Sequence, residues 1–151
     1  MVTVIRSGRG PECGVFPLTQ AVTNPLLIYE GESLSNLPAT VGILQKRTKE
    51  TDGRAGFLVF GPYSSLKAGE YRLNAYGSSD LVASAYVDVV SGKGTVVHAR
   101  FDIEKNAKGL LVDNADVHLS DSAYDIEVRV WVGENDSIDL FGYSLKPYLK
   151  N

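Results

Sequence analysis

The chain has few of the residues that build disulfide, metal or nucleic-acid chemistry. It contains one cysteine, Cys13, which excludes an internal disulfide. Its two histidines, His98 and His118, lie too far apart in the sequence for a local metal motif. The formal net charge of −3 lacks the basic excess that is typical of nucleic-acid-binding domains. We therefore expect no nucleic-acid partner.

Long hydrophobic runs and helical patterns are also missing. No apolar stretch approaches the ~18 residues that a membrane span needs, and no basic-then-apolar leader opens the chain. We therefore expect a soluble protein that does not insert into membranes. The sequence does not indicate where the protein is located, and it leaves open whether the protein forms an oligomer. No segment holds an apolar period of 3.6 residues over a helical length. Phosphate-binding loops, nucleophile elbows and zinc-protease motifs do not occur, so we predict no enzyme activity.

What the sequence does contain is a series of short β-strand patterns separated by turn residues. Residues 125–132 alternate most clearly, with four apolar side chains on one face and Glu127, Arg129 and Trp131 on the other. Charged or polar segments at residues 46–54, 78–80, 91–94 and 113–116 are predicted as loops and turns. The predicted strands cover residues 26–30, 40–45, 57–60, 71–76, 81–90, 95–103, 110–112, 117–119, 125–132 and 138–145.

This pattern predicts an all-β fold, a β-sandwich or jelly roll of roughly eight to ten antiparallel strands. At 151 residues the chain is predicted to form one domain overall. The sandwich is expected over residues 26–151. Residues 1–25 are expected to form a loop-rich entry, with an edge strand near residues 2–5.

Three stretches resemble the galactose-binding-like jelly-roll family, which includes many carbohydrate-binding modules. Residues 68–73 read Ala-Gly-Glu-Tyr-Arg-Leu, and residues 138–147 are similar to the family's closing strand, with Asp139 after an isoleucine and a proline at the end. Glu30-Gly31-Glu32 resembles an acidic pair that several such modules use for a structural calcium, although glycine stands where alanine is usual. The resemblance covers residues 26–147 and implies a lectin-like, carbohydrate-binding jelly roll.

The outward side chains of the predicted strands suit a sugar ligand. A sugar presents an apolar C–H face, on which an aromatic ring stacks, and a rim of hydroxyls that bond to charged and amide groups. Trp131 is the leading candidate because an exposed indole is costly unless it covers something. The predicted partner is a polysaccharide or a glycan terminus, and the candidate ligand-binding residues are Trp131, Arg129, Glu127, Tyr76, Tyr86, Asp88, His98 and Arg100.

Glu30, Glu32 and Asp139 supply hard oxygen ligands of the kind that Ca²⁺ prefers. Since opening and closing strands often lie side by side, we predict a structural calcium there. Two other functions stay open. A structural or protein-interaction β-sandwich of a bacterial or viral surface assembly would show a contiguous apolar patch on its outer face. A small glycan-modifying enzyme would need two carboxylates that face each other across a cleft.

Overall fold

The structure is a computed structural model that describes residues 27–105 and 109–149. In these residues eleven strands form two antiparallel sheets, and one short 3₁₀ helix, η1 (Gly31–Asn36), follows the first strand. Sheet A contains β1 (Leu27–Glu30), β2 (Ile43–Gln45), β3 (Thr48–Glu50), β6 (Gly69–Leu81), β9 (Leu110–Leu119) and β11 (Ser137–Pro147). Sheet B contains β4 (Gly56–Val59), β5 (Pro62–Leu66), β7 (Tyr86–Ser91), β8 (Val96–Asp102) and β10 (Ala123–Val132).

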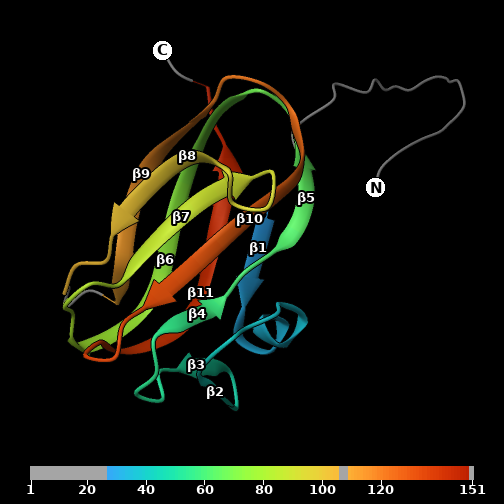
Figure 1. Ribbon diagram of the computed structural model, residues 1–151. Coiled ribbons are helices and arrows are strands. Elements are labelled where there is room, and N and C mark those ends of the chain that lie inside the picture. The colour runs from blue at the N-terminus through green and yellow to red at the C-terminus, as the bar shows by residue number, and fades with distance from the viewer. Residues whose placement is uncertain (1–26, 106–108, 150–151) are drawn as a thin grey trace, which may run out of the picture.

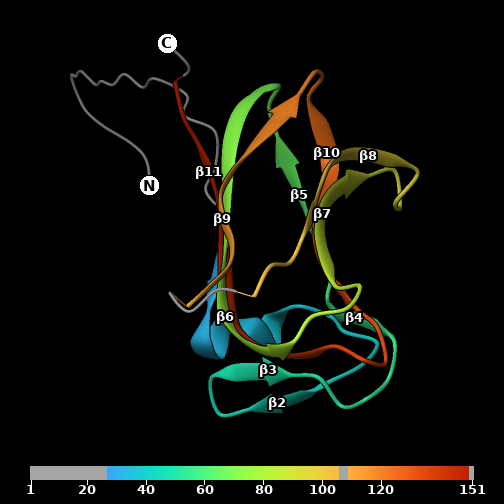
Figure 2. The same cartoon turned by 90° about the vertical axis from the view of Figure 1, so that its left-hand side faces the viewer.

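The two sheets lie face to face and confirm the predicted all-β sandwich (Figure 1). Figure 2 views them edge on, with β6, β9 and β11 on one side and β7, β8 and β10 on the other. Sheet A has the order β2-β3-β11-β6-β9, with β1 also paired to β11. Sheet B has the order β4-β10-β7-β8, and β5 pairs with the same strand β10 that pairs with β4.

The core between the sheets is built by alternate residues of the long strands. Tyr71, Leu73 and Ala75 of β6 are fully buried, and so are the apolar residues of β10 at positions 126, 128, 130 and 132. Each large apolar side chain removed from water in this way contributes roughly 1.5–3 kcal/mol to stability. The alternation predicted for these two strands is therefore confirmed.

Several predicted boundaries are wrong because strand pairing overrides local composition. Residues 78–80, predicted as a turn, belong to β6, where Ser78 pairs with Asp139 of β11. Residues 113–116, also predicted as a turn, lie inside β9, so that the two short strands expected there are one. The charged segment 46–54 contains β3, and residues 62–66, expected to link two strands, form β5. Only residues 43–45 of the strand predicted at 40–45 are extended.

Strand β8 departs from the predicted alternation in a way that matters for the site. The register of β7 and β8 shifts between Val89 and Val90, which leaves His98 opposite no β7 residue. An extra residue of this kind reverses which side chains face in. Val97, predicted to face the core, is exposed, and so is the neighbouring Val96.

The loop-rich entry and edge strand predicted for residues 1–25 lie outside the described residues. In the part of the chain that the structure describes, no helix has the length and apolar character needed to cross a membrane.

Candidate functional site

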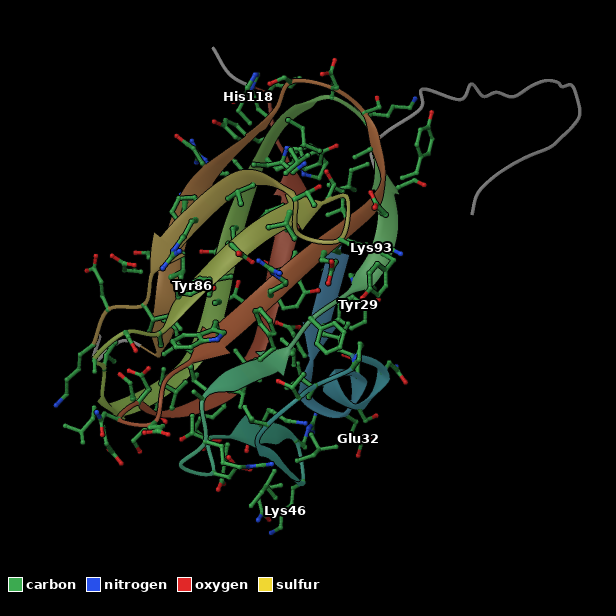
Figure 3. The ribbon with its side chains drawn as sticks, viewed as in Figure 1. Tyr29, Glu32, Lys46, Tyr86, Lys93 and His118 are labelled. Atoms are coloured by element: carbon green, nitrogen blue, oxygen red, sulfur yellow. The ribbon has the colours of Figure 1, made fainter. Side chains whose placement is uncertain are left out.

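The outer face of sheet B gathers most of the predicted ligand-binding residues. Strands β7 and β10 pair so that Tyr86 lies opposite Trp131 and Asp88 lies opposite Arg129. Arg100 reaches the same face from β8, where it pairs with Asp88. Figure 3 views this face, with Tyr86 on β7 and Lys93 on the turn between β7 and β8.

Tyr86 and Trp131 form one row of stacked side chains with Arg100. The two rings are 5.6 Å apart and inclined by 15°, and the Arg100 guanidinium carbon lies 3.7 Å from the centre of the Tyr86 ring. Because β8 and β10 lie on opposite sides of β7, Arg100 and Trp131 approach Tyr86 from opposite sides. The faces of Tyr86 are therefore already used by protein groups, as in other cation–π and stacked pairs.

Asp88, which is buried, and Arg129, which is partly buried, form an ion pair on the same face. The Arg129 Nε and Nη2 atoms donate to the two carboxylate oxygens of Asp88 at 2.9 and 2.7 Å. Asp88 is only 2% exposed, and its carboxylate raises the pKa of the Arg129 guanidinium. The guanidinium carbon also lies 4.7 Å from the centre of the Phe57 ring. Arg129 is therefore held in place by two hydrogen bonds to Asp88 and by its contact with the Phe57 ring.

Beside this pair the face is hollowed into a cleft of about 450 Å³. Strands β4 and β5 and the segment that joins them form one wall, β10 forms the floor, and the β7–β8 turn reaches the rim. The lining is largely apolar, with a few charged groups among the rings, which is the usual composition of a small-ligand site. The residues that line the cleft are Thr40, Phe57, Phe60, Tyr63, Lys93, Glu127 and Arg129.

Two residues of the cleft stand out by their conformation and burial. Glu127 is 5% exposed, yet it belongs to none of the salt bridges found among the described residues. Burial and the interaction of its hydroxyl with the nearby Glu127 carboxylate raise the pKa of Tyr63. Tyr63 itself is 49% exposed and has a φ of +67°, which is uncommon for an aromatic residue. Such backbone strain is concentrated at binding sites.

Two of the predicted ligand-binding residues lie elsewhere. Tyr76 belongs to β6 of sheet A, where its hydroxyl is 3.5 Å from the Ser144 hydroxyl, so it shares no face with Trp131. The register shift in β8 brings the His98 Nε2 atom to 2.8 Å from the Ser91 hydroxyl, and His98 does not line the cleft.

The three predicted calcium ligands do not meet. Glu30 lies opposite Gly142, whereas Asp139 lies opposite Glu50 and Ser78. Glu32 lies in η1, the short helix that follows β1 (Figure 3). Among residues 27–105 and 109–149, no three acidic, histidine or cysteine side chains lie close enough to hold a metal ion. The predicted site therefore does not fit a shared ion, and calcium binding stays a prediction.

The aromatic wall of the cleft was missed by the sequence interpretation. Phe57 and Phe60 read as one apolar strand, yet their rings lie 6.2 Å apart at an angle of 61° and both line the cleft. Tyr63 follows a glycine and a proline, which indicated only a break in the strand. The signal that was available is the density of aromatic residues around that break, at positions 57, 60 and 63.

The two-sheet topology defines the chain as a β-jelly roll with the fold of carbohydrate-binding modules. One structure with this fold is the C-terminal CBM6 of LamC, a marine laminarinase from Zobellia galactanivorans. It shares 11% identity, with a TM-score of 0.54 over 81% of this chain and 99% of that one. Another is the module CBM6cm-2 from Cellvibrio mixtus lichenase 5A, determined with cellotriose. It shares 10% identity, with a TM-score of 0.52 over 85% of this chain and 100% of that one. No protein-family model and no curated protein matches the sequence.

Proposed function

We infer that this domain is a non-catalytic carbohydrate-binding module whose ligand lies on the outer face of sheet B. The observation that carries this proposal is the cleft beside the Asp88–Arg129 pair, where aromatic rings and hydrogen-bonding groups line one hollow. The fold supports it, because both structural neighbours are carbohydrate-binding modules and one was determined with cellotriose.

Tyr63 is the residue best placed to stack on a sugar. Its ring is half exposed at the mouth of the cleft, whereas the faces of Tyr86 are used by Arg100 and Trp131. The Glu127 carboxylate lines the same cleft and supplies acceptors for sugar hydroxyls, whereas the Thr40 hydroxyl is bonded to the backbone of Phe57. Trp131 lies next to Phe57 in the register of β10 and β4, so a longer glycan would extend toward the stacked row.

The proposal is tested by comparing two tyrosines that lie in the same sheet. Tyr63→Ala is expected to weaken retention on a glycan array by about tenfold or more, because it removes the stacking ring. Tyr124→Ala is the matched control, since Tyr124 is 79% exposed on β10 and does not line the cleft. Circular dichroism of both variants verifies the fold. Absence of glycan retention by the wild-type domain, or equal retention by the two variants, would refute this site.

The structural alternative, a protein-interaction module, predicts a contiguous apolar patch in place of such a cleft. The outer face of sheet B instead mixes rings with Asp88, Arg100, Glu127 and Arg129. This mixture is what favours a sugar over a protein partner.

A further inference from the structure

Glu127 is an unusual residue for the floor of an apolar cleft. A buried carboxylate is costly unless a cation or several hydrogen bonds compensate for the lost hydration. Asp88, on the neighbouring strand and equally buried, receives two bonds from Arg129. Glu127 takes part in no ion pair among the described residues, and its charge adds less than that of Asp88 to the raised pKa of Arg129. Two similar carboxylates on one face thus differ in whether an arginine bonds to them directly.

The cations that line the cleft form no salt bridge with Glu127. Arg129 is engaged by Asp88 on both of its bonded nitrogens and lies against Phe57. Lys93 is exposed on the β7–β8 turn, where water and salt screen its charge, and it forms no ion pair within the part of the chain that the structure describes. A carboxylate has room for about four hydrogen bonds. Glu127 therefore keeps acceptor capacity directed into the cleft.

The rings around Glu127 are compatible with a positively charged group. Phe57 and Phe60 form two inclined walls, with ring centres 6.2 Å apart, and Tyr63 lies at the mouth. Aromatic rings stabilise cations through the negative charge of their faces, most strongly where water is excluded. A buried carboxylate beside such rings attracts an ammonium more strongly than it attracts a neutral hydroxyl.

We propose that the cleft selects glycans that carry a free amino group, with Glu127 as the residue that binds the ammonium. The inference rests on the proposed carbohydrate-binding function and specifies its ligand class. In this arrangement the sugar ring packs against Tyr63 and the protonated amine donates to the Glu127 carboxylate. Acetylation of the amine removes the charge and adds bulk, so an N-acetylated glycan loses the interaction.

Three tetrasaccharides with the same β-1,4-linked backbone test this proposal, because they differ only at carbon 2. The substituent is a hydroxyl in cellotetraose, an acetamide in the N-acetylglucosamine tetramer and an ammonium in the glucosamine tetramer. Titration calorimetry at about pH 6 keeps such an amine protonated, since an α-amino group titrates at about 7.7–8.0. The glucosamine tetramer is expected to bind at least about tenfold more tightly than the other two, as charge-assisted hydrogen bonds are stronger than neutral ones.

Glu127→Gln is expected to abolish this preference, since the neutral amide keeps an acceptor at the same place but offers no negative charge to the ammonium. Glu134→Gln is the control, because it removes the same charge from an exposed position on the turn before β11. This control is expected to keep the preference. A preference that survives Glu127→Gln, or is lost with Glu134→Gln, would overturn the assignment to Glu127.

The wild-type series decides the ligand class even if a variant fails to fold. Equal binding of the three tetrasaccharides would overturn the ammonium preference and leave carbohydrate binding standing. Binding of none of them, together with retention of another glycan on the array, would also overturn it. Binding of none, with an array that shows no retained glycan, would instead refute the proposed function.

Discussion

At the scale of single residues, Asp136 shows how a buried carboxylate is stabilised where the protein supplies donors. It accepts hydrogen bonds from the backbone N–H groups of Ala83, Ser84 and Gly133 at 2.5, 3.1 and 2.7 Å. Burial by itself raises the pKa of Asp136, but the backbone donors outweigh it and the pKa is lowered. Asp136 thereby ties the turn after β10 to the segment before β7.

The lowered pKa of Asp136 makes part of the stability dependent on acid. A carboxylate whose folded pKa lies below its unfolded value of about 3.9 stabilises the protein above that pH. The stabilisation is lost as the pH falls through the folded pKa. Asp136→Asn is expected to cost roughly 2 kcal/mol at pH 7, because buried donors lose their acceptor, and to flatten the fall in stability below about pH 4. Urea unfolding at pH 7 and pH 3 measures both effects, with the exposed Asp121→Asn as the control. A variant with unchanged stability at pH 7 would contradict this account.

At the scale of elements, the β7–β8 turn covers the ion pair at the edge of the cleft. Gly94 in this turn has a φ of +87°, and a Cβ atom there would lie 2.9 Å from the Arg129 Nη1 atom. Glycine is therefore needed twice over, for its backbone conformation and for the close approach of the turn to the guanidinium.

A pair of glycines separates these two requirements. Gly53 has a φ of +85° with no atom within 4 Å of a built Cβ, so Gly53→Ala reports the conformational cost alone, about 1 kcal/mol. Gly94→Ala is expected to cost more and also to weaken glycan retention, because it displaces Arg129 on the floor of the cleft. Thermal unfolding and the glycan array measure the two effects. Equal destabilisation of the two variants, with retention unchanged, would show that the turn does not position Arg129.

A strand could be predicted from the sequence where its own side chains determine that it is extended, and not where pairing with a distant strand determines it. The apolar alternation of β10 at positions 126, 128, 130 and 132 was sufficient, because all four side chains enter the core. The end of β6 was not readable, because Ser78 becomes extended only by pairing with Asp139. Likewise Asn114, with a φ of +51°, suits a turn locally, yet β9 continues through it and Asn114 N–H donates to the Asn74 side chain.

The candidate site also has a part that the sequence pattern predicted and a part that it did not. Alternation alone placed Trp131, Arg129, Tyr86 and Asp88 on outer faces, and the register then brought them together. The cleft depends on features that the alternation of apolar and polar residues does not predict. Strands β4 and β5 pair with successive parts of β10, residues 130–132 and residues 123–127, and the register is interrupted between them. The positive φ of Tyr63 then presents its ring at the mouth of the cleft.

At the scale of the whole molecule, the two outer faces differ. The outer face of sheet B holds the aromatic cleft and the stacked row, whereas strands of sheet A line a smaller hollow of about 200 Å³ with acidic side chains, among them Glu50, Asp80 and Asp139. A single small cleft limits the affinity for a polar ligand, because each sugar hydroxyl exchanges bonds to water for bonds to protein with little net gain. One copy of the domain is therefore expected to bind a glycan weakly.

Multivalent display should overcome this weakness only for ligands that reach several clefts. Four biotinylated domains on streptavidin are expected to bind a long polysaccharide about 10²–10⁴-fold more tightly than one domain does, because later contacts form within one assembly. The gain should vanish for a tetrasaccharide, which cannot bridge two clefts, and for tetramers of the Tyr63→Ala variant. Biolayer interferometry with immobilised polysaccharide, competed by free tetrasaccharide, measures all three cases. A gain that persists with Tyr63→Ala would mean that the tetramer adheres through another surface, and that avidity does not arise from the cleft.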